Sequence, residues 1–237
     1  ADAGPEAEAG REATHLLDAW EKGPEAYNAA IAAGIERSRS GGSQVLPLKD
    51  AEKVMDLCSP IGLISCLCRR GTRGADERDE YSYTCMGMGV GMLKWERWPE
   101  RYKGGVAFVS PERAKEWLHA MDKRGFVHSL MTFGAPYIGG FCQCDYPDCW
   151  AIRDRLDFGF GLLKGHYVAM VDYDLCNGCG ICAQRCQFGA LKFEVTIDKA
   201  NVDQFRCFGC GVCESGCPRG AISLIDRMSL PALREVW

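Results

Sequence analysis

Two stretches of the sequence carry cysteines at a spacing that can bind metal. Each stretch reads C-x2-C-x2-C-x3-C, and the second begins 31 residues after the first. Thiolate sulfur is a soft ligand, and three sulfurs on one tight loop can surround an iron-sulfur cluster while a fourth comes from elsewhere. The spacing therefore predicts two cluster-binding loops, with Cys176, Cys179, Cys182, Cys186, Cys207, Cys210, Cys213 and Cys217 as candidate ligands.

The two stretches form an internal repeat that extends beyond the cysteines. CNGCGICAQRCQFGAL in the first aligns with CFGCGVCESGCPRGAI in the second, which indicates duplication of one structural unit. Glycines between the cysteines allow sharp turns and leave backbone amides free to donate hydrogen bonds to cluster sulfurs. The repeats differ after the last cysteine, where Gln187 in the first takes the place of Pro218 in the second.

Residues 167–225 resemble the bacterial-type ferredoxins that hold two 4Fe-4S clusters. The resemblance implies that the fourth cysteine of each stretch binds the cluster of the other stretch. The implied ligand sets are Cys176, Cys179 and Cys182 with Cys217, and Cys207, Cys210 and Cys213 with Cys186. Gln187 departs from the family's proline, and we expect it to change local loop geometry and potential without changing ligation.

Seven of the 15 cysteines lie outside the repeat. Six of these gather in the segments CLCRR, YTCMGMGVGM and CQCDYPDC, and they are Cys66, Cys68, Cys85, Cys142, Cys144 and Cys149. Cys66 and Cys68, with two or three of Cys142, Cys144 and Cys149, would supply the thiolates for a third 4Fe-4S cluster. Cys85 is a candidate for that cluster or for a fourth. A zinc site and free buried cysteines are the alternatives. Cys58 has no close partner in sequence, so we expect it to be a bystander.

These segments are also similar to the cysteine-containing region that precedes the ferredoxin module in some multi-cluster proteins of anaerobes. The similarity implies that the repeat is the C-terminal part of a larger multi-cluster iron-sulfur protein. We expect each cysteine pair to follow a buried strand, and we interpret the Cys-x-Cys spacing as requiring a turn. The glycines at Gly87, Gly89 and Gly91 are interpreted as a flexible turn.

The elements that must position these cysteines can be predicted from apolar patterning and helix signals. Short strands are expected over residues 61–64, 106–109 and 126–133, and a helix that begins at Ser110 and Pro111 ends at Gly125. We expect an α+β fold in three parts. Residues 1–43 form a helical arm and linker, residues 44–165 a small α/β cysteine-rich domain, and residues 166–237 a ferredoxin-like dicluster domain with an added hairpin within 190–205.

Composition narrows the function. The net charge is -4 and the isoelectric point is about 5.7, so the chain has no basic footprint for nucleic acid. No apolar run is long enough to span a membrane. We expect a cytoplasmic protein, and in that reducing compartment abundant cysteine indicates metal or redox chemistry. We expect low-potential electron transfer, under oxygen-poor conditions, to or from a larger oxidoreductase. The alternatives are an enzyme with an incompletely thiolate-ligated cluster in the central domain, fed by the ferredoxin domain, and a redox or iron sensor.

Overall fold

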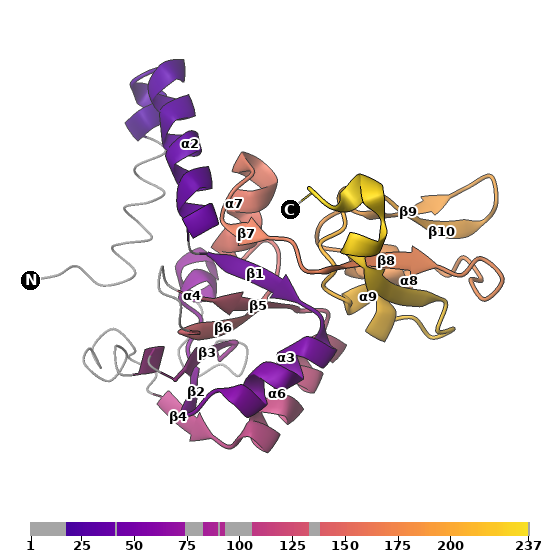
Figure 1. Cartoon of the computed structure of the whole chain (residues 1–237), viewed down its shortest axis with the longest axis horizontal. Helices are drawn as coiled ribbons and strands as arrows, with labels where there is room; N and C mark the ends of the chain where they lie inside the picture. The colour runs from indigo at the N-terminus through magenta and orange to yellow at the C-terminus, as the bar shows by residue number, and fades with distance from the viewer. Residues whose placement is uncertain are drawn as a thin grey trace, which may run out of the picture.

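The computed structural model shows an α+β fold in which a cysteine-rich central unit is followed by a C-terminal unit built on two two-stranded sheets (Figure 1). The residues that the structure describes are 18–40, 42–73, 83–89, 91–92, 106–132 and 138–236. No helix among them is both long and apolar enough to cross a membrane.

A helical arm begins the described part of the chain. Helix α2 (Pro24–Ser40) stands away from the central sheet, and its contact with the rest of the protein is aromatic. The rings of Tyr27 and Phe158 meet edge to face with centroids 6.3 Å apart. The first half of the expected arm, including His15, lies outside the described residues. At the end of the segment expected to form the arm and linker, α2 continues to Ser40 and a strand begins at Ser43.

The central unit is built on a seven-stranded sheet. All neighbouring strands are antiparallel except β1 and β7, which are parallel. In spatial order the strands are β4 (Val106–Val109), β2 (Ile61–Ile64), β3 (Cys85–Met88), β6 (Gly140–Cys144), β5 (Val127–Met131), β1 (Ser43–Leu46) and β7 (Leu162–Leu163). The bounds predicted for β2 and β4 are confirmed.

Strand β3 contains Gly87, so the interpretation of this glycine as part of a turn was wrong, whereas Gly89 does lie in a turn, with φ +50°. Gly87 pairs directly with Gly62 on β2, and a side chain at Gly62 would collide with Val106 and Met92. The glycines therefore let neighbouring elements approach closely. Met86 and Met88 are fully buried and anchor the strand in the core.

The two faces of this sheet have different roles. Helices α3 (Leu48–Leu57) and α6 (Pro111–Lys123) pack side by side over one face and form an apolar core with Met86 and Phe141. Helix α6 begins as predicted, with Ser110 Oγ accepting from the backbone N–H of Arg113 at 3.3 Å. Successive strand residues alternate in direction, so the neighbours of Phe141 on β6 point to the opposite face.

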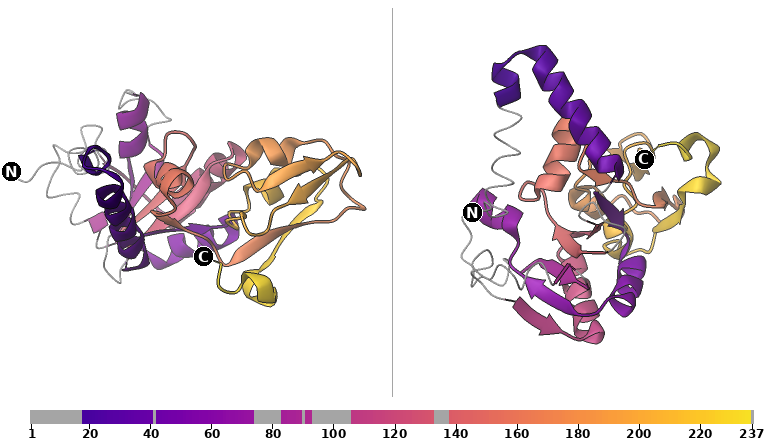
Figure 2. Two further views of the ribbon diagram at one scale, coloured as in Figure 1. Left: turned by 90° about the horizontal axis from the view of Figure 1, so that it is seen from above. Right: turned by 60° about the vertical axis from the view of Figure 1, so that its left-hand side comes forward.

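The C-terminal unit lies beside the central unit (Figure 2). Strand β8 (Tyr167–Val171) pairs antiparallel with β11 (Ile222–Asp226), and β9 (Leu191–Glu194) pairs antiparallel with β10 (Lys199–Val202). The second pair is the hairpin that the sequence predicted within 190–205. Two short helices, α8 (Ile181–Arg185) and α9 (Val212–Ser215), follow the cysteine loops, so the sequence repeat is also a structural repeat.

Candidate metal centres

Two cavities in the C-terminal unit are each lined by four cysteines. The outer cavity, about 330 Å³, is lined by Cys176, Cys179, Cys182 and Cys217. The inner cavity, about 360 Å³, is lined by Cys186, Cys207, Cys210 and Cys213. Each cavity therefore has three cysteines from one stretch and the last cysteine of the other. Cys179 is exposed, whereas Phe188 and Phe208, whose stacked ring centroids are 4.0 Å apart, line the inner cavity.

Backbone amides donate to the sulfurs at equivalent positions of the two halves. Ala190 N–H donates to Cys186 Sγ and Ala221 N–H donates to Cys217 Sγ, both at 3.3 Å. The first cysteine of each stretch also accepts from an amide. The donors are Ala200 to Cys176 at 3.5 Å and Ala169 to Cys207 at 3.4 Å. Amide donors that stabilise negative sulfur are what thiolate ligands of a cluster require.

Glycine is required at one equivalent position in each loop. Gly178 and Gly209 both have φ +70°, and a Cβ at either would collide with a backbone carbonyl oxygen, that of Asp198 or Tyr167. Both loops therefore press against neighbouring backbone with no room for a side chain, one at the turn before β10 and the other at the start of β8. This close approach holds the cysteines around each cavity.

The inner cavity is the more buried of the two, and a cationic side chain lies beside it. Burial raises the pKa of Cys210 and Cys213 above the usual thiol value. Arg227 is fully buried and donates to the carbonyl oxygens of Cys207 and Tyr167 at 2.7 and 2.9 Å. Burial raises the pKa of Cys207, and the positive charge of Arg227 opposes this rise, so Arg227 offsets negative charge at the sulfur.

Residues 175–221 match the protein family described as 4Fe-4S dicluster domain. The C-terminal unit contains a ferredoxin-type dicluster domain. The donor set fits the cofactor that this family implies, because soft sulfurs surround two cavities and accept from backbone amides. A comparison of the chain with curated proteins finds no match.

A second group of thiols lies in the central unit. Six cysteines interact pairwise in a closed ring, which we name the six-thiol ring: Cys66, Cys68, Cys149, Cys144, Cys142, Cys85 and back to Cys66. The sulfurs of Cys85 and Cys142 are 3.4 Å apart. Cys58 follows helix α3 on the other side of the sheet and is not in the ring, as expected for a bystander.

Two strands of the sheet and two helices position the ring. Cys142 and Cys144 both lie within strand β6, so the expectation that Cys-x-Cys requires a turn was wrong for this pair, whereas Cys66 and Cys68 do lie at a strand-to-helix turn. Residues two apart on a strand point to the same face, and β6 therefore presents both sulfurs together. Cys85 sits directly opposite Cys142 in the register of β3.

The remaining ring cysteines come from the segments that adjoin two helices. Cys66 and Cys68 flank the start of α4 (Leu67–Arg73), and Cys149 precedes α7 (Trp150–Phe158). The two helices are linked by a hydrogen bond from Trp150 Nε1 to Thr72 Oγ1 at 3.2 Å. Arg69, nearly fully buried, lies 3.6 Å from Asp148 and so ties α4 to the segment before Cys149.

The pKa values of neighbouring ring thiols shift in opposite directions. Hydrogen bonds with Cys142 and Cys149 lower the pKa of Cys144 to about 5, and those with Cys68 and Cys85 hold the pKa of Cys66 well below the usual value. The same contact with Cys144 raises the pKa of Cys142 and Cys149. Hydrogen bonding between adjacent sulfurs therefore dominates the electrostatics of the ring.

Neither the two cavities nor the ring is preformed around a single ion in the described residues. Across the described ranges, no group of three or more His, Cys, Asp or Glu side chains is arranged to hold a metal ion. The histidines that fall within these ranges also have other surroundings. His128, for example, is fully buried between β5 and the helix-covered core.

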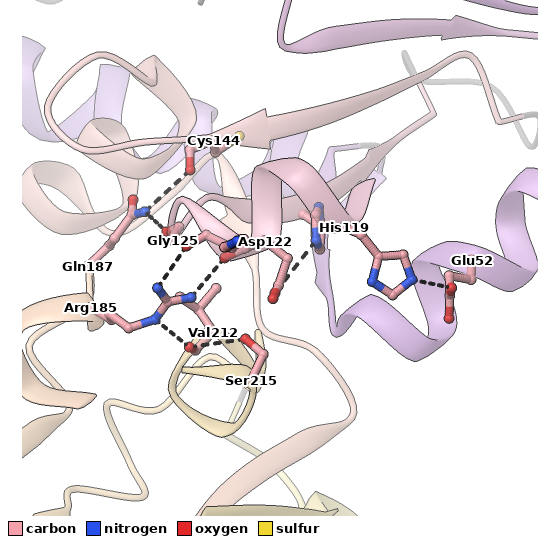
Figure 3. A network of polar contacts seen from close by, with 11 residues as sticks. Glu52, His119, Asp122, Gly125, Cys144, Arg185, Gln187, Val212 and Ser215 are labelled. Atoms are coloured by element: carbon pink, nitrogen blue, oxygen red, sulfur yellow. Dashed lines mark hydrogen bonds and ion pairs between the residues drawn. The ribbon is translucent and has the colours of Figure 1, made fainter. Parts of the chain in front are cut away.

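The dicluster domain and the ring meet at a polar junction (Figure 3). Gln187 Nε2 donates to the carbonyl oxygens of Gly125 at 2.7 Å and Cys144 at 3.4 Å. Gln187 Oε1 accepts from the backbone N–H of Tyr146 at 2.8 Å. Sequence reasoning treated Gln187 only as a departure from the repeat, and the substitution itself was the one signal of this contact.

A second side chain strengthens the same junction. Arg185 donates to the carbonyl oxygens of Asp122 at 2.7 Å and Lys123 at 3.1 Å, and also to that of Val212 within the dicluster domain at 2.9 Å. Apolar packing continues beneath it, since Val127 and Cys144 belong to one buried cluster with Phe188 and Phe208. The ring and the inner cavity therefore share one core.

Proposed function

We propose that the protein is an iron-sulfur electron-transfer component whose dicluster domain holds two 4Fe-4S clusters. The carrying observation is the pair of cavities, each lined by three cysteines of one stretch and the fourth of the other. Cys176, Cys179, Cys182 and Cys217 would hold the outer cluster, and Cys186, Cys207, Cys210 and Cys213 the inner one. When bound, such clusters accept and release single electrons.

The chain's own groups set the conditions for that chemistry. Amide N–H donors stabilise the sulfurs in their thiolate form. Phe188 and Phe208 exclude water from the inner cavity, and Arg227 offsets negative charge beside it. The exposed sulfur of Cys179 makes the outer cavity the end at which an external redox partner, a larger oxidoreductase, exchanges electrons.

We assign one further metal centre to the six-thiol ring, and a third iron-sulfur cluster is its proposed occupant, with zinc as the alternative. The closed pattern of interactions supports one centre rather than two separate ones. Six thiols exceed the four that a 4Fe-4S cluster takes, so two of them would shape the site without being ligands.

A second candidate function is an enzyme whose central cluster has an iron without a protein ligand. The observation that favours it is an open polar cavity of about 670 Å³ at the junction, lined by Arg124, Asp145, Tyr146 and Gln187 among others. A cavity of this size beside two redox sites can admit a small substrate. Spectroscopy of the reduced protein with small ligands separates the two functions, because insensitivity of every cluster signal would contradict the enzyme.

Metal analysis of anaerobically purified protein tests the proposal. We expect more than about eight iron atoms per chain in the wild type, because two 4Fe-4S clusters account for eight. The variant Cys144→Ser should lower the count to about eight, whereas Cys58→Ser, outside the ring, should leave it unchanged. A wild-type count of about eight with one zinc would replace the third cluster by zinc. A count near zero would overturn electron transfer itself.

A further inference from the structure

The two halves of the dicluster domain share the features that surround their sulfurs but differ at the residue after the last cysteine. Equivalent alanines donate to equivalent sulfurs, and equivalent glycines, Gly178 and Gly209, have the same φ. The residue after the last cysteine breaks this symmetry, because it is Pro218 in one half and Gln187 in the other. Proline has no side-chain donor or acceptor, so only the half with glutamine can form the contacts described at the junction.

Those contacts reach both metal-binding regions. Gln187 follows Cys186 directly, and Cys186 lines the inner cavity. Its amide group hydrogen bonds the carbonyl oxygen of Cys144 and the backbone N–H of Tyr146, and Cys144 is a member of the six-thiol ring. One residue therefore connects the loop that bears an inner-cavity cysteine to the strand end that bears a ring cysteine.

The surrounding structure restrains this connection. The bonds of Arg185 to Asp122 and Lys123 fix the end of helix α8 against the central unit. Apolar packing of Val127 and Cys144 with Phe188 fills the space beneath. A displacement of β6 at Cys144 is then transmitted to Cys186, because neither packed cores nor networks of hydrogen bonds absorb movement freely. Neither cavity has a residue of the central unit in its lining, but Phe188 and Phe208 line the inner cavity alone and belong to this shared apolar cluster.

We propose that Gln187 is a positioning residue that couples the six-thiol ring to the inner cavity. A change at the ring alters the centre held by the inner cavity and leaves the outer centre unchanged. By reciprocity, filling the inner cavity also changes the affinity of the ring for its metal. The inference rests on the proposed function, since it requires that the dicluster domain hold its clusters.

The test is a double-mutant cycle read by reduction potential. Cys66→Ser alters the ring at a residue that does not contact the dicluster domain, and the potentials of both dicluster centres are measured by anaerobic titration with electron paramagnetic resonance. Loss of a signal in Cys210→Ser identifies the inner centre, and loss in Cys179→Ser identifies the outer one. We expect Cys66→Ser to shift the inner potential alone. In a Gln187→Ala background that shift should be lost.

The matched control is Pro218→Ala, at the equivalent position of the other half, which should leave the shift intact. Gln187→Glu provides a second variant if Gln187→Ala does not fold, because a carboxylate keeps the acceptor for Tyr146 N–H and loses both donations. It should also abolish the shift. The coupling is overturned if Cys66→Ser shifts both centres equally or neither, or if the shift persists in both Gln187 variants.

Iron analysis separates failure of this inference from failure of the proposed function. Wild-type protein with fewer than about eight iron atoms per chain would contradict the dicluster assignment itself. Protein with both dicluster signals intact, but no dependence on Gln187, would contradict only the coupling.

Discussion

The dicluster cavities and the six-thiol ring each bring several thiols together, but the surroundings of the sulfurs differ. In the dicluster domain each cysteine faces a cavity, and its sulfur is stabilised by backbone amides such as that of Ala190. In the ring each cysteine faces other cysteines, and Cys144 is stabilised as a thiolate by neighbouring thiols. The first arrangement is set by loops close in sequence, and the second is set by a sheet that brings distant segments together.

This difference shows which structural features determine the arrangement of cysteines in each site. The dicluster cavities depend on the local backbone, because glycine turns and amide donors belong to the same loops as the cysteines. The ring depends on tertiary register, because Cys85 and Cys142 meet only through pairing of β3 with β6. Substitutions should therefore act locally in the first region and through the sheet in the second.

The largest expected effect is the loss of a whole centre from the cavity opposite the mutated stretch. Cys217→Ser should empty the outer cavity, although Cys217 belongs to the second stretch, and Cys186→Ser should empty the inner one. Each variant should lose about four iron atoms, and electron paramagnetic resonance should show which signal is absent. If Cys217→Ser removed the inner signal, the crossed arrangement would be wrong.

A smaller effect is expected when a side chain is added where a dicluster loop packs tightly against neighbouring backbone. Gly209→Ala places a Cβ against the carbonyl oxygen of Tyr167 at φ +70°, so unfolding free energy should fall by about 4 kcal/mol. Gly180→Ala is the matched control, because it has φ +75° and open space around it. Its cost should be about 1 kcal/mol. Chemical denaturation measures both, and equal costs would refute the steric argument.

The smallest effect is a pH dependence that belongs to the central unit alone. Burial lowers the pKa of His128 to about 3, below its usual value of about 6.5. The unfolded chain therefore binds a proton that the folded chain does not, and stability falls as pH decreases below about 6.5. Between pH 7.5 and 6.0 this histidine should account for a loss of about 0.8 kcal/mol.

The variant His128→Leu should remove this loss, and urea unfolding at the two pH values measures it. His128 lies 3.9 Å from Asp122 on the helix-covered side of the sheet. Residues 167–237 contain no histidine, so the dicluster signals should not follow the same titration. An unchanged pH dependence in the variant would place its origin elsewhere.

Sequence reasoning predicted some elements well for a physical reason. Strands β2 and β4 are short apolar runs bounded by turn residues, and helix α6 has both a capping serine and a following glycine. These signals are local. Strand β3 was missed because Gly87 and the glycines that follow it indicate a turn when they are considered alone. The role of Gly87 becomes visible only when it is paired with Gly62.

The contacts of Gln187 were beyond prediction for a similar reason. Its partners Gly125 and Cys144 lie 62 and 43 residues away in sequence, and nothing in a spacing pattern identifies an amide donor to a distant carbonyl. The Cys-x-Cys pair on β6 was misinterpreted because the assumption of a turn ignored the alternation of strand side chains.

The sequence by itself determined the dicluster domain, because repeated cysteine spacing and glycine turns are properties of two short loops, whereas the crossed ligand sets were implied by the family resemblance. It also determined that six further cysteines needed an explanation. Only the tertiary structure decided that these six form one ring, and that Gln187 joins it to one half of a nearly symmetric pair. Strand register and long-range hydrogen bonds made those decisions, since both depend on which distant segments the folded core brings into contact.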